Sequence, residues 1–106
     1  MANKHRGEIA AELGGRQRTL VLTLGALAEL ESAFGAHDLV ALAERFGSGR
    51  PSARDLVRII GAGLRGAGEA VTDDDVAVMT VDGGVAGFVR IAAELIAATF
   101  DDGAAR

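Results

Sequence analysis

A glycine pair near the start of the chain most constrains what it can fold into. Gly14-Gly15 separates two short segments in which apolar and polar residues alternate. Such a pair supplies the two positive φ angles that a tight two-residue hairpin turn requires. Pairing the flanking residues across this turn places Ile9 opposite Leu20 on one apolar face. The pattern therefore predicts a β-hairpin over residues 7–22.

Arg18 breaks the alternation of this hairpin. It falls on the apolar face, so either its side chain extends past the end of the hairpin into solvent or the register is off by one. An isolated hairpin is only marginally stable in water, so its apolar face needs a cover. The helix expected from Leu24 is the nearest candidate.

Capping residues mark the helices that follow. The expected caps are Thr23, Asp38, Ser52 and Thr72, each followed by apolar residues at helical spacing. Ser52 to Asp55 resembles a capping box in which Asp replaces the usual Glu or Gln. Gly35 and Gly47 are natural stops for the first two helices, and residues 66–70 interrupt the third.

Apolar residues at intervals of three and four define the expected core stripes. They are Leu27, Leu30 and Phe34; Leu39, Leu42, Ala43 and Phe46; Leu56, Ile59, Ile60 and Leu64; Val76 and Met79; and Phe88, Ile91, Ala92, Leu95 and Ile96 in a last helix over residues 85–100. The fold class is α+β, an N-terminal β-hairpin followed by a compact bundle of four to five short helices.

We expect a single domain of 106 residues without internal repeats. Residues 1–6 form a flexible lead-in, residues 7–22 the hairpin, residues 23–100 the helical part and residues 101–106 a solvated tail.

Composition excludes several classes of function. The net charge is −4 and no aromatic residues alternate with basic ones, which argues against binding to DNA or RNA. The absence of cysteine excludes disulfides, thiolate nucleophiles and cysteine-bound metals. No apolar run approaches the roughly 20 residues of a membrane span, and the polar first residues do not resemble a signal peptide. We expect a cytoplasmic protein without membrane contact.

One segment matches a cofactor motif. Residues 61–66 read G-x-G-x-x-G, the pattern that holds a dinucleotide between a strand and a helix. Here the residues before it carry the cap and spacing of a helix, and the second strand of a βαβ unit is missing. We therefore interpret Gly61, Gly63 and Gly66 as small residues that let two helices approach closely.

Other candidate chemical groups have simpler explanations. Asp73, Asp74 and Asp75 suit the positive end of a helix dipole and lack the alternating spacing of a calcium loop. His37 next to Asp38 lacks a nucleophile that would complete a catalytic site. We predict no catalytic, cofactor-binding or metal-binding residue and no cofactor, and thus no enzymatic activity.

Three arginines fall on one side of the third helix. Arg54, Arg58 and Arg65 are spaced by four and seven residues. They either form a solvated face partly neutralised by Asp55 and Glu69, or a basic stripe that binds an acidic protein partner. They are candidate partner-binding residues.

The chain resembles the small phage-tail family of bacterial gene transfer agents, the phage-like particles encoded by many alphaproteobacteria. The resemblance rests on the order of the segments GEIAAELGGRQRTLVLTLGALAELE, DLVALAERF, SGRPSARDL, VRIIGAGLRGAG and VTDDDVAVM. It extends from about Gly7 to Phe100. That family has been described both as a tail tube protein and as a tail assembly chaperone, and it implies no catalytic residues.

The resemblance implies a role in building a tail. A tube wall generally requires many strands per subunit, whereas an assembly chaperone needs only apolar grooves or an open strand edge. We therefore expect an assembly chaperone that binds the tape-measure protein and other tail proteins, with self-association as a further option. Its docking surface would be the hairpin edge or the last helix around Phe88, Ile91 and Leu95.

Two alternatives remain at this point. One is a structural tail component, tube or connector, that stays in the virion-like particle. The other is a small enzyme or nucleotide-binding protein built on residues 61–66.

Overall fold

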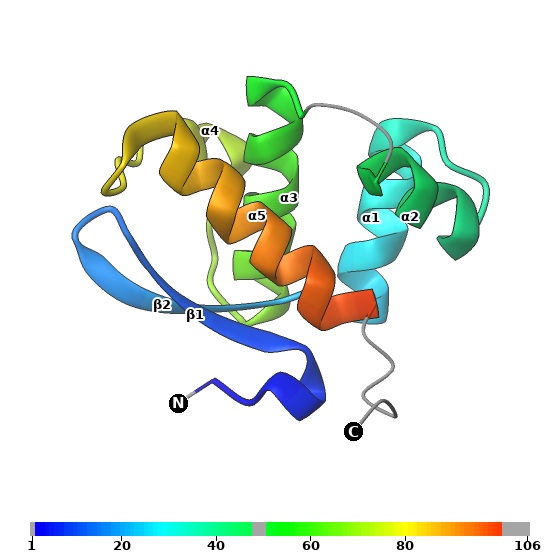
Figure 1. Cartoon of the computed structure of the whole chain (residues 1–106), viewed down its shortest axis with the longest axis horizontal. Coiled ribbons are helices and arrows are strands. Elements are labelled where there is room, and N and C mark those ends of the chain that lie inside the picture. Colours follow the sequence, from blue (N-terminus) through cyan, green and yellow to red (C-terminus); the bar gives the residue numbers. More distant parts are fainter. Residues whose placement is uncertain (1, 48–50, 101–106) are drawn as a thin grey trace.

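The hairpin and the helices occur in the predicted order. The computed structural model describes residues 2–47 and 51–100 (Figure 1). The elements are a 3-10 turn η1 (Lys4–Arg6), strands β1 (Glu8–Leu13) and β2 (Arg16–Val21), and helices α1 (Leu24–Phe34), α2 (Leu39–Gly47), α3 (Ala53–Gly66), α4 (Asp73–Ala77) and α5 (Gly84–Phe100). The predicted α+β class is confirmed. The predicted tail over residues 101–106 lies outside the described residues, as does most of the loop before Pro51.

The hairpin has the register that the sequence predicts. Ile9 pairs with Leu20, and Leu13 with Arg16 across the turn. Gly14 and Gly15 have φ angles of 61° and 88°, in the left-handed region that favours glycine. The backbone N–H of Gly14 also donates to the carbonyl oxygen of Thr80 at 2.9 Å, which fixes the hairpin tip to the segment after α4.

Arg18 keeps its place on the apolar face, so the register is not shifted. Its Nε donates to the carbonyl oxygen of Leu13 at 2.9 Å, and its Nη1 forms an ion pair with Glu69 at 2.5 Å. Only 11% of the Arg18 side chain is exposed. The guanidinium therefore finds a carboxylate inside the protein instead of reaching into solvent.

The helix caps follow the predicted pattern. Thr23 accepts from Ala26 N–H, and Gly35 closes α1 in a left-handed conformation with φ 69°. Ser52 and Thr72 each form a reciprocal capping box with the aspartate three residues later. The Asp38 carboxylate accepts from Ala41 N–H at 2.8 Å. Local sequence therefore sets where each of these helices begins.

Helix α3 lies at the centre of the molecule. It contacts β2, α1, α4 and α5, whereas α2 packs chiefly on α1. The curved hairpin passes below α3 and α5, and α5 runs across the front of α3 (Figure 1). The hairpin cover is thus made mainly by α3 and α5, and not by α1 as the sequence suggested.

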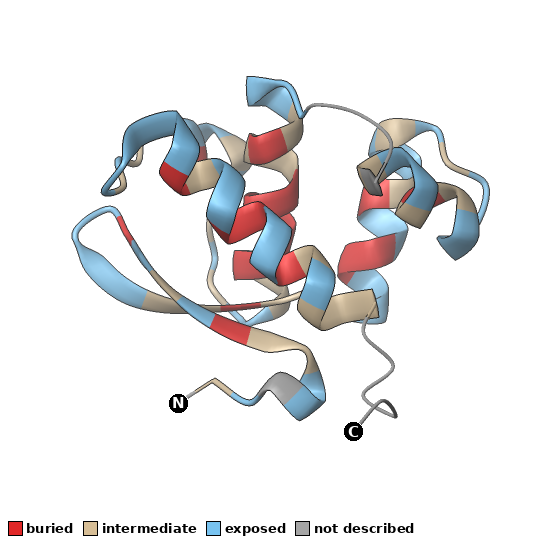
Figure 2. Ribbon diagram, in the orientation of Figure 1, coloured by how far each residue is buried: buried red, intermediate tan, exposed pale blue. Residues whose placement is uncertain are grey.

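The core gathers where α3 meets its neighbours (Figure 2). Its fully buried large side chains are Ile9, Leu13, Leu20, Leu30, Leu42, Ile59, Ile60, Leu64 and Leu95. Most of the predicted stripe residues are buried or half-buried, but Leu39 is 41% exposed. It is the first residue of α2.

Candidate interaction surfaces

The glycine motif of residues 61–66 lies entirely within helix α3. There is consequently no strand-to-helix turn at which a pyrophosphate could meet a helix N-terminus. A Cβ on Gly63 would sit 2.7 Å from a methyl group of Leu95 in α5 and 3.2 Å from Leu20 in β2. A Cβ on Gly66 would overlap with the carbonyl oxygen of Val21. Gly63 thus allows a close approach between two helices, as the sequence suggested, whereas Gly66 allows a close approach between α3 and strand β2.

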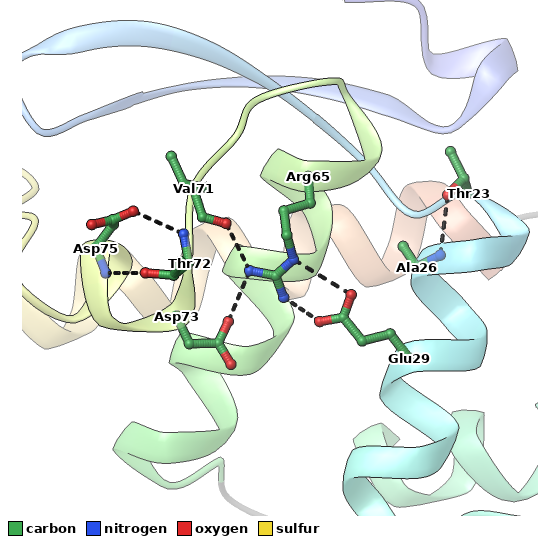
Figure 3. A network of polar contacts seen from close by, with 8 residues as sticks. All are labelled: Thr23, Ala26, Glu29, Arg65, Val71, Thr72, Asp73 and Asp75. Carbon is green, nitrogen blue, oxygen red and sulfur yellow. Dashed lines mark hydrogen bonds and ion pairs between the residues drawn. The ribbon is translucent and has the colours of Figure 1, made fainter.

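Gly61 packs against the side chains of Arg65 and Asp73. These two residues belong to a polar network that also includes Glu29 (Figure 3). The guanidinium of Arg65 binds the carboxylate of Glu29 in α1 through two nitrogens. Its Nη1 donates to the carbonyl oxygen of Val71 at 3.1 Å and lies 3.1 Å from Oδ1 of Asp73. A single side chain therefore connects α1, α3 and the start of α4.

The network keeps Arg65 charged. The hydrogen bond to the Glu29 carboxylate raises the pKa of Arg65 above its usual range, partial burial opposes that rise, and Asp73 adds to it. The Asp73 Oδ1 atom is buried and has only the Arg65 cation beside it. Each charge compensates another, so the network stabilises the contact between helices and offers no free group for chemistry.

The three predicted arginines do not form one free basic stripe. Arg65 is engaged as described, and Arg58 donates to the carbonyl oxygen of Ala33 at 2.9 Å. Arg54 is exposed at the start of α3. The expected neutralising partners also differ, because Asp55 pairs with Arg45 at 3.6 Å and Glu69 with Arg18.

The apolar candidates on α5 are mostly in the core. Ile91 is 6% exposed and Leu95 is fully buried, while Phe88 is half-buried against the same cluster. Their side chains are occupied by intramolecular packing. A partner that binds α5 must therefore contact its other side.

An open apolar groove lies between the end of α1 and helices α2, α3 and α5. It has a volume of about 250 Å³. Its lining includes Phe34, Phe46, Ile59, Val89 and Ile96. The rings of Phe34 and Phe46 meet edge to face at 5.6 Å, and Arg45 stacks over Phe34 at 5.2 Å. Sequence reasoning missed this groove because its residues come from four helices spread along the chain.

The hairpin presents unpaired backbone at both of its edges. Within the described residues the sheet has only β1 and β2, so each strand has one side without a strand partner. Its exposed residues include Glu12, Gln17 and the small Ala10. An extended segment of another protein could pair there by strand addition.

Two further classes of site find no support in the described ranges. No cluster of three or more potential ligands could hold a metal ion there. None of the helices described has both the length and the apolar character needed to cross a bilayer.

The molecule is thus a small α+β domain. Its polar clusters connect its helices and strands to one another, and the features that remain accessible to a partner are surfaces. The family described as "Phage tail tube protein, GTA-gp10" matches residues 6–102. No curated protein and no solved structure gives a significant match. The chain belongs to this phage tail family of gene transfer agents.

Proposed function

We propose that the protein is a structural component of a gene transfer agent tail, a tube or connector subunit that stays in the particle. The observation that carries this proposal is the family match over residues 6–102, nearly the whole chain. The hairpin supplies two strands of six residues each. A connector that joins other tail proteins through helices and a strand edge makes better use of this shape than a wall built from many strands.

The same proposal makes the protein non-enzymatic. Two observations support this proposal. The glycines of the cofactor-like motif serve close packing inside the domain, and each charge of the Arg65 network is paired with an opposite charge. Function then depends on contacts with other tail proteins.

Quantitative mass spectrometry of purified particles tests the proposal. We expect peptides of this chain at a fixed ratio to the major tail protein in every preparation. If the chain is abundant in producing cells but missing from intact particles, the structural role is wrong.

An assembly chaperone that binds the tape-measure protein is the second candidate. It is favoured by the open hairpin edges and by the apolar groove between α2 and α5. Co-expression with the tape-measure protein tests it: the two should co-purify, and the tape-measure protein should stay soluble only with its partner present. Charge changes at the hairpin, Glu12→Lys together with Gln17→Glu, should reduce that solubility. Unchanged solubility would exclude the hairpin as the docking surface.

A further inference from the structure

Helix α5 carries apolar residues on its solvent-facing side as well as on the side that packs against the core. Only two of its seventeen residues are charged, Arg90 and Glu94. Its inner side packs against the core through Ile91, Ala92 and Leu95. A helix that is apolar nearly all round is usually covered on all sides. One side of α5 nevertheless faces solvent, as the pale blue bands along it in Figure 2 show.

The open side carries a continuous apolar strip, which we call the α5 stripe. It consists of Val85, Ala86, Val89, Ala93 and Ala97, all exposed. Val85 is 72% exposed and Val89 37%. Val89 and Ala93 also line the apolar groove beside α2, so the stripe is continuous with a hollow.

The two charges of α5 border the stripe along one side. Arg90 and Glu94 lie one turn apart and are exposed. Among the described residues, neither side chain makes a hydrogen bond or an ion pair. An arginine four residues before a glutamate is the less favourable order for pairing within a helix. Both charges thus remain open to a partner outside the chain.

The stripe and its charges complement a second copy of themselves. In an antiparallel pair related by a twofold axis near Ile91 and Ala92, each contact occurs twice. Val85 of one copy then faces Ala97 of the other, and Val89 faces Ala93, so that large side chains meet small ones. The same alignment leaves Arg90 of one copy and Glu94 of the other offset by two residues, about 3 Å along the helix axis, which their long side chains can span. We propose that the α5 stripe is the contact between two copies of this chain, packed antiparallel along α5.

Charge reversal tests the alignment. Sedimentation equilibrium of the purified chain should show a species of twice 10.8 kDa that dissociates on dilution. Arg90→Glu places like charges in contact at both symmetric positions and should weaken the dimer about tenfold. The double variant Arg90→Glu/Glu94→Arg restores opposite charges and should return the affinity to within about threefold of the original.

A substitution within the stripe tests the surface itself. Ala93→Glu adds a charge at an exposed helical site that a good helix former can occupy, so the fold should be kept. We expect it to abolish the dimer. Leu24→Glu is the matched control, since Leu24 is 79% exposed on a different helix and should leave the dimer intact. Far-UV circular dichroism and the melting temperature verify folding of each variant.

Cross-linking tests the direction of packing. The chain has no cysteine, so introduced thiols are the only ones present. A mixture of Val85→Cys and Ala97→Cys proteins should give mainly the mixed disulfide under mild oxidation, because the antiparallel arrangement brings these positions together. Disulfides only within each variant would overturn it.

Other results would overturn the proposal as a whole. These are a monomer at every concentration up to about 1 mM, or a dimer that Ala93→Glu leaves unchanged. If the chain is monomeric and Ala93→Glu abolishes capture by the tape-measure protein, the stripe binds that protein instead. Since the dimer is measured on the isolated chain, the result is independent of whether the protein remains in particles.

Discussion

Gly66 is a residue at which the fold leaves no room for a side chain. A Cβ added there would overlap with the carbonyl oxygen of Val21, so a methyl group must displace backbone rather than a side chain. Gly25 in α1 is the opposite case, because an added Cβ would meet only the Thr23 hydroxyl at 3.8 Å. The same substitution should therefore have opposite effects at the two positions.

We predict that Gly66→Ala lowers the free energy of unfolding by about 3 kcal/mol through overpacking. Gly25→Ala should raise it by about 0.5–1 kcal/mol, because alanine loses less backbone entropy in a helix. Urea denaturation followed by circular dichroism measures both. Equal effects of the two substitutions would mean that β2 and α3 are not in close contact.

At the scale of residues, the sequence does not reveal contacts between side chains that lie far apart along the chain. Arg18 could be recognised as a misfit because the alternation of the hairpin is local. Its partner Glu69 lies 51 residues away and leaves no pattern near Arg18. The neighbours of Gly63 and Gly66 are equally remote, so the motif showed small residues without showing what they pack against.

At the scale of elements, Arg65 links three helices through polar contacts. It connects α3 to Glu29 in α1 and to Asp73 in α4, and its own side chain is 27% exposed. Both carboxylates are more than 40% exposed, so solvent weakens each ion pair. The network therefore orients α4 more than it stabilises the whole fold.

We predict that Arg65→Gln lowers the free energy of unfolding by about 1–2 kcal/mol. The pKa of Arg65 is raised in the folded state, so its contribution is complete below the pKa of an unfolded arginine and is lost only at strongly alkaline pH. The difference between the two proteins should thus be flat from about pH 6 to about pH 9. Thermal unfolding across that range is the measurement, and a slope would contradict the assignment.

The positions of the helices were the easiest feature to predict from the sequence. Each helix start depends on a side chain that bonds within three residues, as in the capping boxes of Ser52 and Thr72. The contacts between elements were less predictable. Closeness along the chain favours α1 as the cover of the hairpin, whereas α3 and α5 do most of this covering.

For the whole molecule, α3 determines how stability is distributed. Its residues from Ile59 to Leu64 are all buried, and four other elements pack on it. Helix α2 packs mainly on α1 and carries the exposed side chains of Leu39 and Val40. Local opening of α2 therefore exposes far less apolar area than opening of α3.

We predict that amide hydrogens of α3 exchange only by global unfolding, and that those of α2 exchange at least about tenfold faster. Hydrogen exchange followed by mass spectrometry at peptide level measures this difference. Uniform exchange rates in the two helices would show that α2 is as firmly attached as the rest.

The candidate surfaces belong to this scale and could be predicted only in part. The sequence pointed to α5, but to its core-facing residues Phe88, Ile91 and Leu95. The open side was not recognised because alanines such as Ala93 and Ala97 read as helix formers and give no sign of exposure. The groove beside α2 could not be predicted because it depends on the relative placement of four helices.

The closing of the hairpin tip onto Thr80 has a consequence for synthesis on the ribosome. The first strands to emerge acquire their lasting contacts only when residues more than sixty positions later have left the exit tunnel. Leu95, which covers Gly63 and lies in the last helix, comes later still. The nascent hairpin therefore stays exposed while most of this domain is being translated. The domain reaches its final form in one late step.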